Sequence, residues 1–120
     1  MSKKILIIED DPDILDMMAY ILRDEGYEVS TSLDCRPLPE ISFLKPDLIL
    51  LDNRLTAGYG KDACKKLKLD VLTAHIPVIL VSANQYLEQL SRDSLADGFM
   101  AKPFNIDELV AIARRHCPVS

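Results

Sequence analysis

The chain has 120 residues, the size of one domain with one hydrophobic core. Hydrophobic residues make up 48% of it, charged residues 28%, and no apolar run approaches a membrane span, so we expect a soluble, cytoplasmic protein that does not bind membranes. The net charge of −5 lacks the basic surplus of nucleic-acid-binding domains, and we expect no direct nucleic-acid contact. The widely spaced Cys35, Cys64 and Cys117 predict free thiols rather than disulfides or a zinc site.

The first predicted element is a strand. Ile5–Ile8 is an unbroken apolar run, which is typical of a strand buried on both faces of a parallel sheet. Glu9 and Asp10 follow it directly. Asp11 then suits the N-cap of a helix, with Pro12 in the first turn. The spacing of the apolar residues that follow is helical.

The next segment is less regular. Gly26 is a suitable stop for the first helix. Residues 27–31 are mixed in polarity and predict an edge strand. Residues 33–44 should contain a second helix, but Pro37 and Pro39 interrupt it. We therefore expect this helix to be short or irregular.

A second apolar run, Leu48–Leu51, predicts another buried strand, and Asp52 follows it. Open α/β sheets place their sites at such C-terminal strand ends. A loop with Gly58 and Gly60 should follow, and then a helix up to about Leu69.

The C-terminal part repeats the pattern. Val78–Val81 predicts a buried strand that ends at Ser82. A helix is predicted from Tyr86 to about Asp97, and a short strand over Gly98–Ala101, with Lys102 directly after it.

The last predicted helix starts at Asn105, with Glu108 three residues on, as in a capping box. Five strands then alternate with five helical stretches, which predicts an α/β fold with a parallel sheet covered on both faces. Residues 1–120 should form a single domain.

The predicted strand ends share one edge of the sheet, and all but one of them carry polar residues. They deliver Glu9, Asp10, Asp52, Ser82 and Lys102. Like charges about 4 Å apart repel by roughly 4 kcal/mol at an effective dielectric near 20, so the three acids need a counter-charge. A site of few carboxylates with open positions suits Mg²⁺, and a lysine and a hydroxyl suit a phosphoryl group. These parts together can bind and transfer phosphoryl groups.

These residues also resemble a known family. Ile5–Asp10, Leu48–Asp52, Val78–Ala83 and Phe99–Phe104 are similar to the motifs of bacterial response-regulator receiver domains, the CheY-like superfamily of two-component signalling. The resemblance covers essentially the whole chain. It implies a flavodoxin-like, doubly wound (βα)5 fold with strand order 2-1-3-4-5, an order that is also known for this type of protein.

The resemblance also implies roles for the acids. Asp52 corresponds to the residue that accepts a phosphoryl group from a phosphohistidine. Asp10 corresponds to a direct Mg²⁺ ligand, Glu9 to its partner acid, and Arg54 to the position that lends a backbone carbonyl to the metal. Lys102 corresponds to the lysine that pairs with Asp52 and then with the phosphoryl group.

Other implied features concern switching and partners. Ser82 occupies the hydroxyl position of the switch and Phe99 the aromatic one, and the Lys102–Pro103 bond should be cis. The expected partners are a histidine kinase or phosphotransfer protein and a downstream protein or fused output domain, read through the fourth helix, fifth strand and fifth helix. The receiver should be a monomer or a phosphorylation-dependent dimer. It should not be an enzyme, since it would catalyse only its own phosphorylation and dephosphorylation.

Three alternatives stay open at this point. The chain could be a receiver-like interaction module that works without phosphorylation, because Thr56 replaces a frequent loop proline and the second helix is irregular. A phosphatase of the haloacid-dehalogenase type would need a second acid where Arg54 stands. A flavodoxin would need a phosphate-cradling loop after the first strand. Arg54 and Asn84 also occupy variable positions that tune the lifetime of the acyl phosphate.

Overall fold

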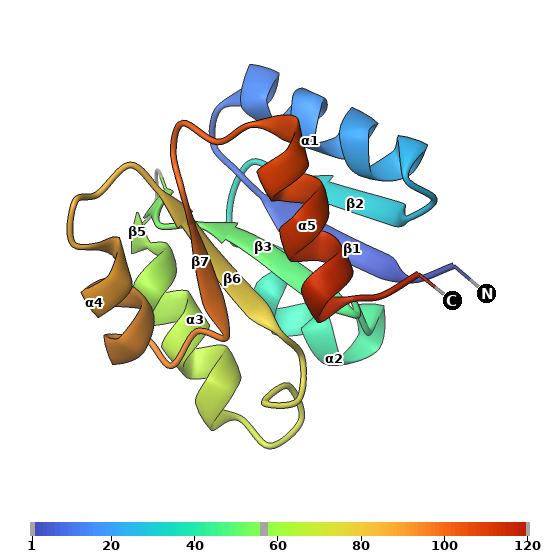
Figure 1. The fold of residues 1–120 in the computed structure, drawn as a ribbon. Coiled ribbons are helices and arrows are strands. Elements are labelled where there is room, and N and C mark those ends of the chain that lie inside the picture. The colour runs from blue at the N-terminus through green and yellow to red at the C-terminus, as the bar shows by residue number, and fades with distance from the viewer. Residues whose placement is uncertain (1, 56–57, 120) are drawn as a thin grey trace.

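The computed structural model describes residues 2–55 and 58–119, and its centre is a five-stranded parallel sheet (Figure 1). The sheet order is β2-β1-β3-β6-β7. Renumbered along the chain, this is the order 2-1-3-4-5, which confirms the predicted flavodoxin-like α/β fold. The strands are β1 (Lys4–Ile8), β2 (Glu28–Ser32), β3 (Leu48–Asp52), β6 (Val78–Ser82) and β7 (Gly98–Ala101).

Helices cover both faces of this sheet (Figure 1). One face carries α1 (Pro12–Asp24) and α5 (Ile106–His116). The other carries α2 (Ile41–Leu44), α3 (Gly60–Leu69) and α4 (Leu87–Asp93). None of the helices in the described part of the chain combines the length and the apolar character that crossing a bilayer requires.

The apolar runs form two cores because successive side chains of a strand point to opposite faces. Ile5 and Ile7 of β1 pack in the core under α1 and α5, whereas Leu6 and Ile8 pack under α2, α3 and α4. The strand β3 is divided in the same way, and all five of its residues are buried. Burying such an aliphatic side chain contributes roughly 1.5–3 kcal/mol. The unalternating sequence pattern is therefore the consequence of a sheet covered on both sides.

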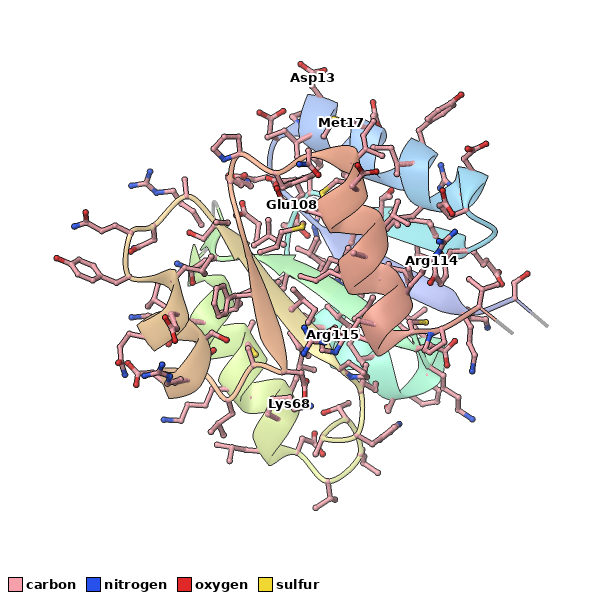
Figure 2. The ribbon with its side chains drawn as sticks, in the orientation of Figure 1. Asp13, Met17, Lys68, Glu108, Arg114 and Arg115 are labelled. Carbon is pink, nitrogen blue, oxygen red and sulfur yellow. The ribbon has the colours of Figure 1, made fainter. Side chains whose placement is uncertain are left out.

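The predicted N-caps of the first and last helices are confirmed. Asp11 Oδ1 accepts hydrogen bonds from the backbone N–H groups of Asp13 and Ile14. Asn105 Oδ1 accepts one from the N–H of Glu108 at 2.8 Å. These caps satisfy backbone donors that have no partner inside a helix. An ion pair between Arg114 of α5 and Glu25 joins the two helices of this face, and Figure 2 shows Arg114 where α5 approaches α1.

The second helix is short, as the prolines predict. A 3₁₀ turn, η1 (Leu38–Glu40), is followed by the four residues of α2, and the chain then turns at Lys45 with a left-handed φ of 48°. The fourth helix is shorter than predicted: α4 ends at Asp93, and Leu95 takes a φ of 66°, which is incompatible with a continuing helix.

The segment after Asp52 differs from the predicted loop. It contains two short strands, β4 (Arg54–Leu55) and β5 (Gly58–Tyr59), paired antiparallel. Thr56, which replaces a frequent loop proline, lies outside the described residues. Two-residue strands show no hydrophobic alternation, which is why the sequence does not reveal them.

Candidate functional site

Three carboxylates meet at the C-terminal edge of the sheet. Glu9 and Asp10 follow β1, and Asp52 ends the neighbouring strand β3, whose Leu51 pairs with Ile8. One carboxylate oxygen from each acid lies within 4.8 Å of the other two. Glu9 and Asp52 are only 1% and 4% exposed, whereas Asp10 is exposed. The predicted convergence of these acids, which we call the acidic rim, is therefore present in the structure.

Lys102 enters the acidic rim from the end of β7. Its Nζ lies 2.6 Å from Glu9 Oε1 and 3.4 Å from Asp52 Oδ1. Its backbone N–H donates to the carbonyl oxygen of Ser82 at 2.9 Å, which fixes the lysine next to the end of β6. The resemblance implied a pairing with Asp52, and the structure places the ammonium group closer to Glu9.

Burial and mutual repulsion change the titration of the acidic rim. The pKa of Asp52 is raised from 3.8 to about 7, first because the carboxyl group is buried and second because it lies beside Glu9. Burial acts to lower the pKa of Lys102, but contacts with Glu9 and Asp52 outweigh it and the pKa is raised. The lysine therefore stays charged at neutral pH. Near pH 7 the carboxyl group of Asp52 is present in both its protonated and its ionised form.

The donor set fits a hard divalent cation. Glu9 Oε2 accepts a hydrogen bond from the N–H of Asp11 at 3.1 Å, which orients the carboxylate. The other oxygen, Oε1, is buried and has only the ion pair with Lys102, without hydrogen-bond geometry. A buried oxygen in this state, together with two more carboxylates, suits Mg²⁺, which is held by a few carboxylates and keeps several waters. Glu9, Asp10 and Asp52 are the residues that would hold such an ion.

The structure brings some of the other predicted site residues to this edge and leaves others apart. Ser82 is buried at the end of β6, and its Oγ accepts from the N–H of Asn84 at 3.0 Å. Phe99 is 43% exposed on the edge strand β7. Arg54 has an exposed side chain. The role of its backbone carbonyl as a metal ligand stays a prediction. The Lys102–Pro103 bond is cis, as the resemblance implies.

Two residues behind Asp52 were not predicted. Asn53 is 6% exposed, and its Oδ1 accepts from the N–H of Lys61 in the first turn of α3. Gly60 donates its N–H to the Asn53 carbonyl at 2.7 Å. A Cβ atom at position 60 would lie 2.3 Å from the carbonyl oxygen of Asp52. This close approach requires glycine. Gly60 was predicted to lie in a loop before the helix, and the structure makes it the first residue of α3.

The sequence matches the family model of the response regulator receiver domain over residues 5–114. Two curated relatives are the DNA-binding dual master transcriptional regulator RpaA of Synechocystis sp. and the DNA-binding response regulator MtrA of Mycolicibacterium smegmatis. They are 37% and 34% identical over 92% and 95% of this chain. The aligned regions make up 47% and 50% of those proteins, so the chain spans about half their length.

These relatives correct one prediction. The expectation of no direct nucleic-acid contact is wrong, because RpaA and MtrA are both named as DNA-binding regulators. The acidic charge of these 120 residues was a poor guide, since the matched region is about half of each relative and charge reports only on the region counted.

A solved structure supports the same assignment. The receiver domain of the sensor histidine kinase PA1611 from Pseudomonas aeruginosa has a TM-score of 0.84 and 28% identity to this chain. The match covers 97% of this chain and 98% of that domain, whose crystal structure has a magnesium ion coordinated in the active site cleft. With the acidic rim, the strand order and the family match in agreement, the chain belongs to the family of response regulator receiver domains of two-component signalling.

Proposed function

We propose that Asp52 of this receiver takes a phosphoryl group from a phosphohistidine on a histidine kinase or phosphotransfer protein, in a magnesium-dependent reaction. The single observation that carries the proposal is the acidic rim, in which a buried carboxylate lies among two further acids and one lysine. The domain would catalyse only its own phosphorylation and dephosphorylation, and in that sense it is not an enzyme.

The transfer is a substitution at phosphorus. One carboxylate oxygen of Asp52 attacks the phosphorus atom, and the O–P bond forms as the N–P bond of the phosphohistidine breaks. The electron pair of the broken bond stays on the imidazole nitrogen, which is then protonated by solvent. Bound Mg²⁺ would supply positive charge for the ionised carboxylate and for the phosphoryl oxygens.

The residues of the chain position and neutralise the charges. Glu9 and Asp10, with Asp52, would hold the cation. Lys102 already lies within 3.4 Å of Asp52 Oδ1 and can follow the negative charge onto the phosphoryl group. Ser82 ends the adjacent strand β6, and rotation of its hydroxyl away from the Asn84 N–H would let it donate to a phosphoryl oxygen.

The phosphoryl group adds roughly −1.5 to −2 charge, and its contacts favour one of two conformations. We assign the readout to the face formed by α4, β7 and α5, because β7 connects Phe99 to Lys102 in three residues. In a longer protein built like its relatives, the partner that contacts this face would be a DNA-binding output region.

Intact mass spectrometry tests the proposal. Incubation with acetyl phosphate and Mg²⁺ should add one phosphate-sized mass to the wild-type chain, and EDTA should prevent it. Asp52→Asn should show no gain. Asp16→Asn, which removes an exposed carboxylate on α1, should be modified like wild type. No gain in the wild type, or an equal gain in Asp52→Asn, would show that Asp52 is not the acceptor.

A further inference from the structure

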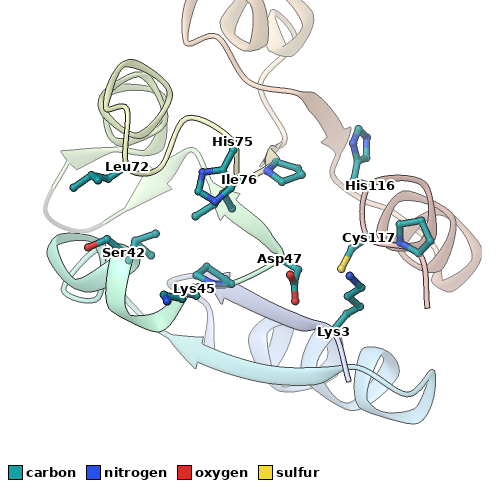
Figure 3. Close-up of a pocket in the computed structure, with 13 residues that line it drawn as sticks. Lys3, Ser42, Lys45, Asp47, Leu72, His75, Ile76, His116 and Cys117 are labelled. Atoms are coloured by element: carbon teal, nitrogen blue, oxygen red, sulfur yellow. The ribbon is translucent and has the colours of Figure 1, made fainter. Parts of the chain in front are cut away.

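A hollow lies at the N-terminal ends of the strands, opposite the acidic rim. It has a volume of about 690 Å³ and is lined by residues that precede β1, β3 and β6 and that follow α5 (Figure 3). We call it the basal pocket. Small-molecule sites in proteins typically measure about 300–1,000 Å³, so the volume suits a ligand larger than an inorganic ion.

The shortness of α2 leaves this edge open. The helix has only four residues, and the chain reverses at Lys45 before it enters β3. Ser42 and Lys45 border the basal pocket on this side, and Leu72 and His75, from the turns that follow α3, border it across from them (Figure 3).

The charge of the basal pocket is opposite to that of the protein. The whole chain has 14 Lys and Arg against 19 Asp and Glu. Of the thirteen described residues that line the pocket, Lys3 and Lys45 carry a positive charge, and Asp47 is the one acid. One oxygen of Asp47 already accepts a hydrogen bond from the N–H of Lys4 at 2.8 Å. The pocket therefore favours an anion.

The remaining wall is largely apolar. Ile41 and Ile76 are buried lining residues, three prolines also line the pocket, and Leu72 is 64% exposed. Apolar surface beside a few charged groups is the usual composition of a site that binds an organic molecule by its body and orients it by its charge. A flat ring would cover the apolar wall, and a phosphate would reach the lysines.

Lys45 departs from a local rule at this site. A residue that ends a helix in the left-handed region is usually glycine, because a side chain there is strained. At a φ of 48° this chain has a lysine, which is one of the residues that line the basal pocket. Residues that break a local structural preference are concentrated at functional positions. The lysine thus places charge where backbone stability alone would select glycine.

We propose that the basal pocket binds an organic anion of the size and chemistry of a nucleoside monophosphate, with the phosphate near Lys45 and the ring on the apolar wall. The site is independent of the acidic rim, because the two lie at opposite ends of the same strands. The inference does not depend on phosphorylation of Asp52.

The probe is adenosine monophosphate, followed by amide chemical shifts in the presence of EDTA. Saturable shifts should be confined to the segments that precede β1, β3 and β6 and that follow α5. Adenosine and pyrophosphate are the two comparison probes, and each should bind at least about fivefold more weakly, the effect of losing roughly 1 kcal/mol. Asp52→Asn should bind adenosine monophosphate as wild type does, which separates this test from that of the proposed function.

Lys45→Gly is the decisive variant. Glycine relieves the left-handed strain, so the melting temperature should stay equal or rise while the affinity falls about fivefold. Lys65→Ala, which removes an exposed lysine of α3 outside the basal pocket, should leave the affinity unchanged.

Several results would overturn the proposal. They are the absence of saturable shifts at a Kd below about 10 mM, equal binding of adenosine or of pyrophosphate, and equal binding by Lys45→Gly.

Discussion

Replacing Asp52 by asparagine tests the electrostatics of the acidic rim. The pKa of Asp52 is raised from 3.8 to about 7 by burial and by the neighbouring Glu9. In the folded, metal-free protein the carboxyl group keeps its proton up to neutral pH, whereas in the unfolded chain it ionises near its ordinary pKa. The folded state thus binds more protons over this interval. Stability from this group is fully present below the ordinary pKa and is lost as the pH rises through about 7.

The size of the effect follows from the shift. About three pKa units at 1.36 kcal/mol per unit give roughly 4 kcal/mol in total. Part of this is already lost at pH 5, where the unfolded carboxyl group is ionised. Between pH 5 and pH 8, the free energy of unfolding of wild type should therefore fall by about 2–3 kcal/mol more than that of Asp52→Asn.

Urea unfolding in EDTA at several pH values measures this difference. Subtracting the variant from the wild type removes the contribution of titrating groups away from the acidic rim, among them His116, whose pKa is lowered by burial. The control variant Asp16→Asn should follow the wild-type pH profile. Parallel pH profiles for wild type and Asp52→Asn would refute the conclusion that burial and Glu9 raise the pKa of Asp52. Excess Mg²⁺ at pH 8 should narrow the gap, since a bound cation removes the repulsion.

Three further changes test how the surrounding structure holds the site. Gly60→Ala would place its Cβ 2.3 Å from the Asp52 carbonyl oxygen, so we expect a loss of about 1–3 kcal/mol in urea unfolding and slower phosphorylation by acetyl phosphate. Lys68→Met removes an ion pair of 2.8 Å between α3 and Asp97 (Figure 2 labels Lys68), and should cost about 1–3 kcal/mol in the same assay. Asn105→Ala removes the N-cap of α5 and should cost about 1 kcal/mol.

Controls on the same elements keep these predictions sharp. Lys66→Met on α3 exchanges an exposed lysine and should change the stability by less than about 0.5 kcal/mol. Asp107→Ala in the first turn of α5 should cost less than Asn105→Ala, because Asn105 is the residue whose side chain caps the Glu108 N–H. Unchanged unfolding in Gly60→Ala would mean that the backbone behind Asp52 yields easily.

Much of the site can be predicted from the sequence because its residues directly follow buried strands, which are easy to recognise. The runs Ile5–Ile8, Leu48–Leu51 and Val78–Val81 can only be covered on both faces, and parallel strands deliver whatever follows them to one edge. The convergence of Glu9, Asp10 and Asp52 is a consequence of topology alone.

What the sequence could not predict depends on tertiary distances. The preference of Lys102 for Glu9 is set by how β7 lies beside β6, which no local pattern encodes. The early end of α4 depends on the left-handed Leu95, a residue type that gives no warning of it. The basal pocket arises from the space that a short α2 leaves next to the turns before β6, and pockets of this kind have no periodicity to detect.

The ion pair between Lys102 and Glu9 has a consequence for the protein when magnesium is scarce. It means that the protein carries a counter-ion of its own, covalently attached and always present. On the proposed function, a cell short of magnesium would lose the signal from this receiver before it lost the folded molecule.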